Sequence, residues 1–239
     1  MKRRIGLFGG TFNPIHIGHL RSVIEVREAF GLDKVYLILS AVPPHKSNVG
    51  LIDVKDRLNM IRLAVEEPNE YSECPKKYPE NYNDKPFEIS DVEIKRAGRS
   101  YTIDTVRYFK STAQKNDSFY LIVGLDAFLE IHSWKSYEAL LESISIIVMA
   151  RPEENPADNR MRWEILKDYL NTEISKDYRL DPVQSAFVHP NRKKIHTVDV
   201  SLLDISSAKI RKLIGNDRSI RYLVPDKVEA FINTRGLFR

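Results

Sequence analysis

Two histidines that follow a pair of glycines are the residues of this chain whose types and spacing point most directly to chemistry. His16 and His19 are three positions apart, so they share one face of a helical turn. Gly9 and Gly10 precede them, directly after a short apolar strand at 4–8. A strand, a turn and a helix start in this order place backbone N–H groups and two imidazoles around one small volume. Free N–H groups and the helix dipole both favour an anion there, so the segment predicts phosphate binding.

Several other kinds of site are not supported. The glycine pair matches neither the G-x-G-x-x-G dinucleotide fingerprint nor the G-x-x-x-x-G-K-[ST] phosphate loop. A zinc site needs a third ligand and a partner for each imidazole, and nothing near the histidines supplies them. The one cysteine, Cys74, excludes an internal disulfide framework and a cysteine-based zinc site. The sequence shows no Ser/His/Asp or Cys/His nucleophile arrangement.

A second group of residues near the C-terminal end also fits an anion. Ser206 is a typical helix N-cap, and the hydroxyls of Ser206 and Ser207, with Arg211 one turn later, form a potential second phosphate cradle. Lys46 follows two prolines and is either a fixed cation or a solvated lysine. Asp126 follows a buried run and either binds a ribose hydroxyl or caps the next helix.

Apolar runs alternate with helical patterns, which predicts an α/β fold with a doubly wound, mostly parallel sheet and helices on both faces. We expect strands at 4–8, 35–39, 87–94, 119–123, 144–149 and 197–200, and helices near 18–30, 53–65, 157–172, 207–214 and 226–232. Residues 100–104 lead into one further expected helix, which carries Val106 and Phe109. In such a sheet, ligands bind beyond the carboxyl ends of the strands, where the strand order reverses. Gly9-Gly10 and Gly124-Leu125-Asp126 follow expected strands directly, so we expect them at that edge.

The length fits a single domain over 1–239. Surface insertions without regular structure are expected near 67–86 and 152–195, the second holding one helix, and a helical segment is expected over 204–239. The formal net charge of +4 suits anionic substrates and does not argue for nucleic acid. No apolar run is long enough for a membrane span and no signal peptide is evident, so we expect a cytoplasmic protein. A homo-oligomer is left open.

Residues 9–19 resemble the H-x-G-H nucleotidyltransferase superfamily. Motifs spaced in order over nearly the whole chain narrow the resemblance to bacterial nicotinate-nucleotide adenylyltransferases: Pro43-Pro44-His45-Lys46, Ser100-Tyr101-Thr102-Ile103-Asp104-Thr105-Val106, Gly124-Leu125-Asp126, Ser133-Trp134, Ile205-Ser206-Ser207 with Arg211, and Arg221-Tyr222-Leu223-Val224-Pro225. The resemblance implies a Rossmann-like fold and a reaction in which ATP and nicotinate mononucleotide give deamido-NAD and pyrophosphate. It also implies Mg²⁺ with the ATP, held mainly through phosphates rather than by side-chain ligands.

The resemblance also implies roles for individual residues. His16, His19, Lys46 and Arg211 would be catalytic. The ATP site would comprise Gly9, Gly10, Thr11, Phe12, Gly124, Asp126, Ile205, Ser206 and Ser207. The nicotinate nucleotide would be held by Asn13, Lys46, Thr102, Asp104, Trp134, Lys135 and Arg151, with Trp134 stacked on the pyridine ring. Ala208 departs from the threonine usual in the family after the two serines, which removes one hydroxyl from the second cradle.

Other functions share parts of this pattern. His16-Ile17-Gly18-His19 also spells the H-I-G-H of class I aminoacyl-tRNA synthetases, but the K-M-S-K-S-like loop and far longer chain of those enzymes are missing. A sister transferase would use nicotinamide mononucleotide, phosphopantetheine or a cytidine nucleotide. A nucleotide-sensing module without catalysis would use the same fold.

Overall fold

A computed structural model describes residues 3–43, 50–65, 85–96, 98–150 and 156–239. Within these residues the chain forms an eight-stranded sheet with the order β3-β2-β1-β4-β5-β8-β7-β6. Six neighbouring strands are parallel: β3 (Phe87–Ser90), β2 (Lys34–Leu39), β1 (Arg4–Gly10), β4 (Ser118–Gly124), β5 (Ser145–Ala150) and β8 (Ile195–Asp199). The last two, β7 (Ala186–Val188) and β6 (Arg179–Asp181), are antiparallel.

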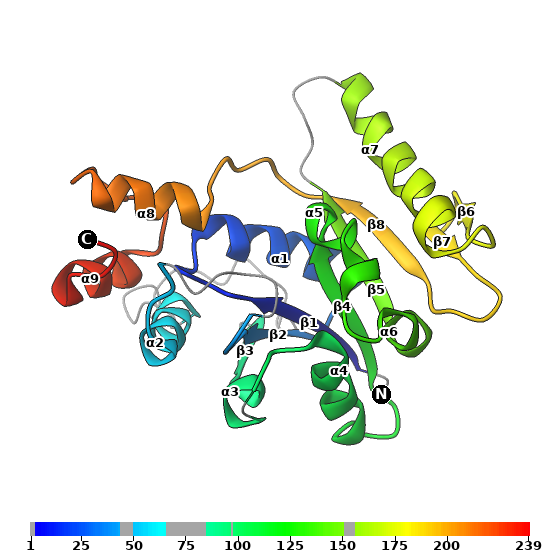
Figure 1. Cartoon of the computed structure of the whole chain (residues 1–239), viewed down its shortest axis with the longest axis horizontal. Helices are drawn as coiled ribbons and strands as arrows, with labels where there is room; N and C mark the ends of the chain where they lie inside the picture. The colour runs from blue at the N-terminus through cyan, green and yellow to red at the C-terminus, as the bar shows by residue number, and fades with distance from the viewer. Residues whose placement is uncertain (1–2, 44–49, 66–84, 97, 151–155) are drawn as a thin grey trace, which may run out of the picture.

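Helices cover both faces of the sheet, and each face has its own apolar core. One core is formed with α1 (Ile17–Phe30), α2 (Val54–Val65), α8 (Ser207–Gly215) and α9 (Asp226–Arg235). The other is formed with α3 (Val92–Arg96), α4 (Thr102–Ser111), α5 (Leu125–Phe128), α6 (Tyr137–Ser143) and α7 (Pro156–Tyr169). Figure 1 shows α1 on one side of the sheet and α3 and α4 on the other. The predicted doubly wound α/β class is confirmed.

The strand order reverses between β1 and β4. The chain runs outward from β1 through β2 to β3, returns across the sheet, and continues from β4 to β5 on the other side of β1. Because all these strands are parallel, their carboxyl ends share one edge, where a crevice opens between the two directions of winding. Gly10 and Gly124, which end β1 and β4, therefore lie at the edge where the sequence places them.

The expected strand at 87–94 is only half right. Its first half is β3, but from Val92 the chain forms α3 instead. The N–H groups of Ile94 and Lys95 both donate to the carbonyl of Asp91, at 3.0 Å, so a helical turn begins there. The spacing of apolar residues fits either period over such a short stretch, and this local hydrogen bonding decides between them.

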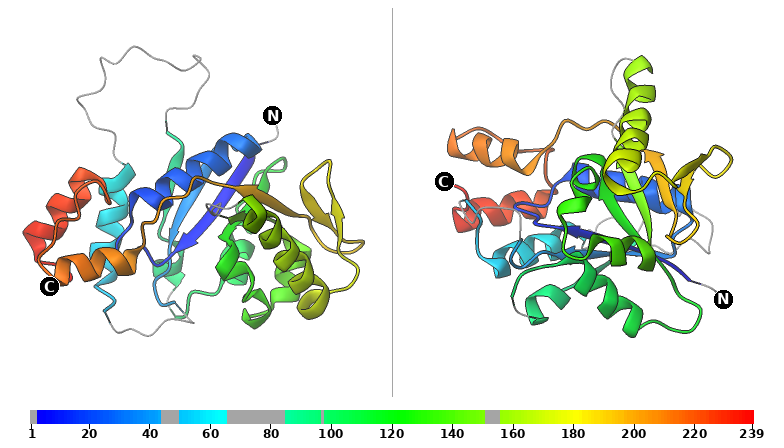
Figure 2. Two further views of the ribbon diagram at one scale, coloured as in Figure 1. Left: turned by 90° about the horizontal axis from the view of Figure 1, so that it is seen from above. Right: turned by 45° about the vertical axis from the view of Figure 1, so that its right-hand side comes forward.

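The stretch 152–195 is more ordered than predicted. After α7 comes a π-helical turn, Leu170–Ile174, and then β6 and β7 form a hairpin that extends the sheet beyond β8. Phe187 and Leu170 are fully buried and attach this segment to the core. The hairpin lies at the opposite end of the molecule from α8 and α9, and α9 lies beside α2 (Figure 2). The expected insertion at 67–86 falls almost wholly outside the described residues, and the single domain over 1–239 stays a prediction.

Candidate active site

A cavity of about 300 Å³ opens at the carboxyl ends of β1, β2 and β4. Seven of the predicted site residues line it: Gly9, Gly10, Thr11, Thr102, Gly124, Trp134 and Lys135. Its other walls come from residues such as Ser40 and Pro43 after β2, Glu93 on α3, Ser100 and Tyr101 before α4, and Glu130. The cavity therefore has one end formed by glycines and backbone and another formed by an indole, a lysine and the start of a helix.

The glycine end is shaped by Phe12. A Cβ on Gly10 would lie 2.6 Å from Cζ of Phe12, so no larger residue fits there, whereas a Cβ on Gly9 would have nothing within 4 Å. Phe12 adopts a φ of +45° and its ring is buried against Phe8 and His19. The side chain of Phe12 thus belongs to the core, and only its backbone is left for the contact with ATP predicted for this residue.

The two histidines lie together at the start of α1. Their ring centroids are 3.5 Å apart with an angle of 21° between the planes, and His16 is 2% exposed. Each backbone N–H donates to the Nδ1 of the other ring at 3.3 Å, a reciprocal cap of the helix end. An Nδ1 that accepts carries no proton, so the proton of each neutral ring lies on Nε2.

The first turn of α1 offers fewer free donors than the sequence predicts. The Ile17 N–H donates to the carbonyl of Leu223 at 3.0 Å, and the His19 N–H donates to His16. Of the first three N–H groups, only that of Gly18 has no acceptor within the part of the chain that the structure describes. The phosphate cradle predicted at this helix start is therefore smaller, because residues of the C-terminal segment and the histidines themselves already cap it.

The start of α8 packs against the loop between β1 and α1. Ser207 Oγ donates to the carbonyl of Pro14 at 2.8 Å, and Arg211 Nη1 donates to the carbonyl of Asn13 at 2.8 Å. Ser206 caps α8 by accepting from the Lys209 N–H. The structure thus brings the second predicted cradle beside the first, with buried Ile205 between them. It also uses both serine hydroxyls within the protein, which the sequence interpretation did not anticipate.

The other end of the cavity carries a cation. Lys135 Nζ lies 3.1 Å from Asp104 Oδ2 and 4.4 Å from the centroid of the Tyr101 ring. Asp104 also faces Arg107 at 3.6 Å and does not line the cavity, so its carboxylate orients the lysine at the rim. Trp134, half-buried, forms the wall beside them.

Tyr169 holds the turn that carries Trp134. Its hydroxyl accepts from the His132 N–H at 3.2 Å and lies 2.8 Å from Nδ1 of the same residue. Burial raises the pKa of Tyr169, so the hydroxyl stays protonated and can donate to that nitrogen. The 3₁₀ turn Ile131–Ser133 is closed by the Trp134 N–H, which donates to Ile131. The segment after β5, predicted to be a surface insertion, thus supports the turn that carries one wall of the cavity.

Twelve of the predicted site residues are not in the cavity lining. Two of them fall outside the described residues, and the other ten are Phe12, Asn13, His16, His19, Asp104, Asp126, Ile205, Ser206, Ser207 and Arg211. Asn13 is buried, and its amide joins the carbonyl of Gly50 and the N–H of Ile52 instead. Asp126 is exposed in the first turn of α5 and lies outside the lining. Lys46 and Arg151 fall outside the described residues.

Two charged residues were missed by the sequence interpretation. Arg57 is 1% exposed, and its guanidinium donates to carbonyls at the ends of β1 and β2. Burial lowers the pKa of Arg57, and the nearby Asp53 opposes this shift without reversing it. Glu93 lines the cavity and accepts from Thr105 Oγ1 at 2.6 Å. Nothing local in the sequence distinguishes either from a solvated charge on a helix.

Comparisons with known proteins place the chain in a family. A family model described as cytidylyltransferase-like matches residues 7–213. A "Probable nicotinate-nucleotide adenylyltransferase" of Desulfatibacillum aliphaticivorans is 39% identical over 98% of this chain and 99% of its own. A protein of the same name from Geobacter sulfurreducens is 37% identical over 98% of both chains. The chain belongs to the nicotinate-nucleotide adenylyltransferase family.

Solved structures agree with this family at the level of the fold. A nicotinic acid mononucleotide adenylyltransferase of Plasmodium falciparum, complexed with NaAD, superposes with a TM-score of 0.68 over 99% of this chain and 97% of its own, at 18% identity. Together with the full-length relatives, which show the family, they confirm the resemblance inferred from the motifs.

Proposed function

We propose that this chain transfers the adenylyl group of ATP to nicotinate mononucleotide, giving deamido-NAD and pyrophosphate. An oxygen of the 5′-phosphate of the mononucleotide attacks the α-phosphorus of ATP. The bond from that phosphorus to the oxygen bridging to the β-phosphorus breaks, and pyrophosphate leaves with the bridging oxygen. Because the acceptor brings its own nucleophile, the protein needs no catalytic serine or cysteine. Its task is to hold two anions in line and to offset charge on the phosphoryl oxygens.

The observation that carries this proposal is the two-ended cavity at the reversal of strand order. Its glycine end suits a triphosphate. The ring of Phe12 lies between this end and the stacked histidines, in contact with both Gly10 and His19. The other end of the cavity, with Trp134 and Lys135 beside the start of α4, suits an aromatic ring that bears a carboxylate. Full-length similarity to proteins named nicotinate-nucleotide adenylyltransferase supports the same acceptor.

In this reaction, we expect the Nε2–H groups of His16 and His19 to donate to phosphate oxygens. Arg211, which is anchored on the β1–α1 loop, and Lys46 would add positive charge beside the triphosphate. Holding both substrates in a reactive geometry contributes roughly 7–11 kcal/mol to lowering the barrier.

The substrate is ATP with its Mg²⁺. Among the described residues, no group of three or more His, Cys, Asp or Glu side chains could hold a metal ion. As the family resemblance implies, the ion's ligands would come mainly from phosphate oxygens and water, a usual arrangement for Mg²⁺. The cytoplasmic location and a homo-oligomer stay predictions. No helix in the described part of the chain is long and apolar enough to cross a membrane.

Pyrophosphate release tests this function. The purified chain is mixed with ATP and Mg²⁺ and, in parallel, with nicotinate mononucleotide, nicotinamide mononucleotide or phosphopantetheine, and a further reaction pairs CTP with the same acceptors. We expect the fastest release with ATP and nicotinate mononucleotide. Faster release with another pair identifies a sister transferase. Binding of ATP without release for any acceptor identifies a non-catalytic nucleotide-binding module.

A further inference from the structure

Arg57 joins the ends of the two strands that border the cavity. Its Nη1 donates to the carbonyls of Thr11 at 2.9 Å and Ser40 at 2.7 Å, and its Nη2 donates to that of Ala41 at 3.0 Å. Its Nε donates to the carbonyl of Ile52 at 3.2 Å, just before α2. A buried cation is costly unless its donors are satisfied, and here carbonyl dipoles surround it. Thr11 and Ser40 themselves line the cavity.

Ser100 holds the same segment from the opposite side. Its Oγ accepts from the N–H groups of Ala41 at 2.9 Å and Val42 at 3.2 Å. In a trans peptide the C=O and N–H groups point in opposite directions. The peptides that follow Ser40 and Ala41 are therefore fixed between Arg57, which binds their oxygens, and Ser100, which binds their N–H groups.

The same rule applies at the end of β1. Because the Thr11 carbonyl faces Arg57, the N–H of Phe12 in the same peptide points to the side away from Arg57. Within the described residues this N–H has no acceptor. One guanidinium thus fixes the orientation of a free backbone N–H group after β1. It also fixes the start of the loop after β2, and that loop continues to Lys46.

We propose that Arg57 is a positioning residue for adenylyl transfer, which sets the β1–α1 loop and the loop after β2 at a fixed distance from each other. This inference rests on the proposed function, in which the first loop receives the triphosphate and the second approaches the mononucleotide. Arg57 contacts neither substrate in this scheme. Its planar fork reaches several carbonyls at once, which the shorter, point-like ammonium of a lysine does not reproduce.

The first test is Arg57→Lys, with kcat and KM measured separately for ATP and nicotinate mononucleotide. A shift of about 1 Å between the loops costs about 10²-fold in rate. We expect kcat to fall by about that factor while each KM changes by less than about fivefold, since each substrate keeps its own contacts and only their relative placement is lost. A merely structural role would lower the melting temperature and leave kcat unchanged in the folded protein.

Arg27→Lys is the matched control. Arg27 is also a buried arginine, 6% exposed, but it lies near the other end of α1, about 12 Å along the helix from His19. We expect this variant to lose stability and to keep kcat within about twofold of the wild type.

A double-variant cycle tests whether Arg57 acts through the shared peptides. Ser100→Ala alone is expected to lower kcat by about tenfold, and the combination with Arg57→Lys to lower it by less than the product of the two effects, because both residues fix the same peptides. If Arg57→Lys does not fold, Ser100→Ala decides alone.

Three results would overturn the proposal: a folded Arg57→Lys with kcat within threefold of the wild type, independent effects in the cycle, or full activity of Ser100→Ala. Failure of the proposed function looks different, since the wild-type chain itself would then release no pyrophosphate from ATP and nicotinate mononucleotide.

Discussion

Replacing His19 by alanine should separate two contributions that this side chain makes at the start of α1. The ring accepts a hydrogen bond from the His16 N–H at 3.3 Å and stacks on the His16 ring. In the proposed reaction its Nε2–H also donates to a phosphate oxygen. The first contribution affects the free energy of unfolding, and the second affects kcat.

The two magnitudes differ enough to be distinguished. The long cap hydrogen bond contributes about 0.5–1 kcal/mol, and the ring stacking about 0.5–1.5 kcal/mol. Their joint loss lowers the melting temperature by about 2–10 °C for a chain of this size. Loss of one donor to the transition state lowers kcat by about 10²–10³-fold. A protein stable by about 5–15 kcal/mol stays folded after such a change, so unfolding does not account for the lost turnover.

The assay is pyrophosphate release at saturating ATP and nicotinate mononucleotide, with circular dichroism to follow thermal unfolding. His196→Ala is the control, because His196 is half-buried between the rings of Phe30 and Tyr120 and lies away from the cavity lining. It should lower the melting temperature and leave kcat unchanged. Turnover of His19→Ala within fivefold of the wild type would refute the reasoning, as would an equal loss in both variants.

Three further predictions concern the acceptor end and the stability of the fold. Trp134→Ala should raise KM for nicotinate mononucleotide by about tenfold, from about 1–3 kcal/mol of lost stacking, and KM for ATP by much less; equal rises in steady-state kinetics would contradict stacking. Tyr169→Phe should raise the same KM a few-fold, because loss of the hydrogen bonds to His132, about 0.5–1.5 kcal/mol, loosens the turn that carries the indole; an unchanged KM would remove Tyr169 from the site. Glu25→Gln should weaken the acid sensitivity of unfolding: burial acts to raise the pKa of Glu25, but hydrogen bonds from Ser201 and Arg21 outweigh it and leave that pKa below its ordinary value. The ionised carboxylate therefore stabilises the fold at pH values above the ordinary pKa of a glutamate, and this contribution is lost as the pH falls through the lowered pKa. Urea unfolding at pH 7 and pH 3 should show the smaller difference for the variant, and identical pH dependence in the two proteins would argue against this contribution.

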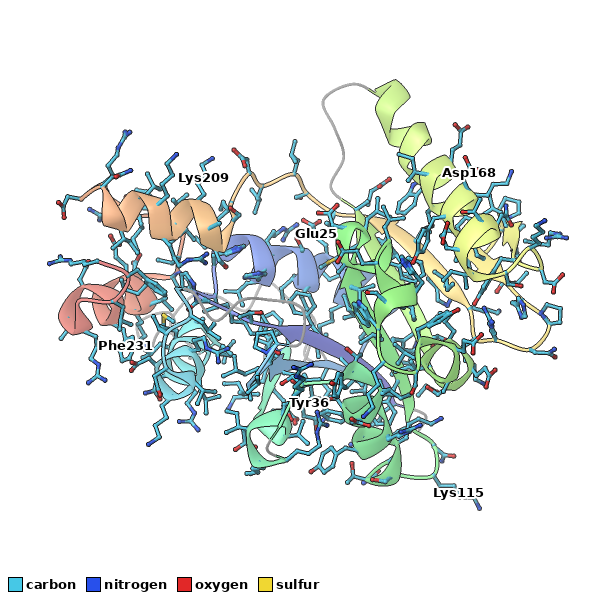
Figure 3. The ribbon with its side chains drawn as sticks, in the orientation of Figure 1. Glu25, Tyr36, Lys115, Asp168, Lys209 and Phe231 are labelled. Atoms are coloured by element: carbon cyan, nitrogen blue, oxygen red, sulfur yellow. The ribbon has the colours of Figure 1, made fainter. Side chains whose placement is uncertain are left out.

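The position of Glu25 explains why its hydrogen bonds bear on the site. It lies on α1 near the connection from β8 to α8 (Figure 3). Its carboxylate accepts from both the N–H and the hydroxyl of Ser201 at 2.6 Å. This contact holds the approach to α8 against α1, and α8 in turn supplies Arg211.

The parallel half of the fold could be predicted because its signals are local. Val35–Leu39 is a continuous apolar run, and Gly31 ends α1 with a φ of 54°, a conformation that glycine adopts without strain. The hairpin β6–β7 gave no such signal. Its strands have three residues each and depend on pairing with β8, which no local pattern encodes.

The candidate site could be predicted in its composition and less well in its contacts. The motifs identified the residues at the carboxyl edge of the sheet, since glycines after apolar runs are a local pattern. They did not show that His16 and His19 cap each other, because the usual cap is Ser or Thr followed by Glu. They also did not reveal Arg57, because its acceptors are carbonyl groups, which every residue type carries alike.

The contacts that close the start of α1 have a consequence for how the protein matures. The Ser207–Pro14 and Arg211–Asn13 hydrogen bonds join residues 193 and 198 positions apart, and the acceptor for the Ile17 N–H is Leu223. Contacts of such long separation form late. During translation the N-terminal strands emerge roughly 10–40 s ahead of these partners, in a chain that grows by about 5–20 residues per second. A nascent chain on the ribosome therefore has its β1–α1 loop without its C-terminal supports, and catalytic competence is acquired only once Leu223 has left the exit tunnel.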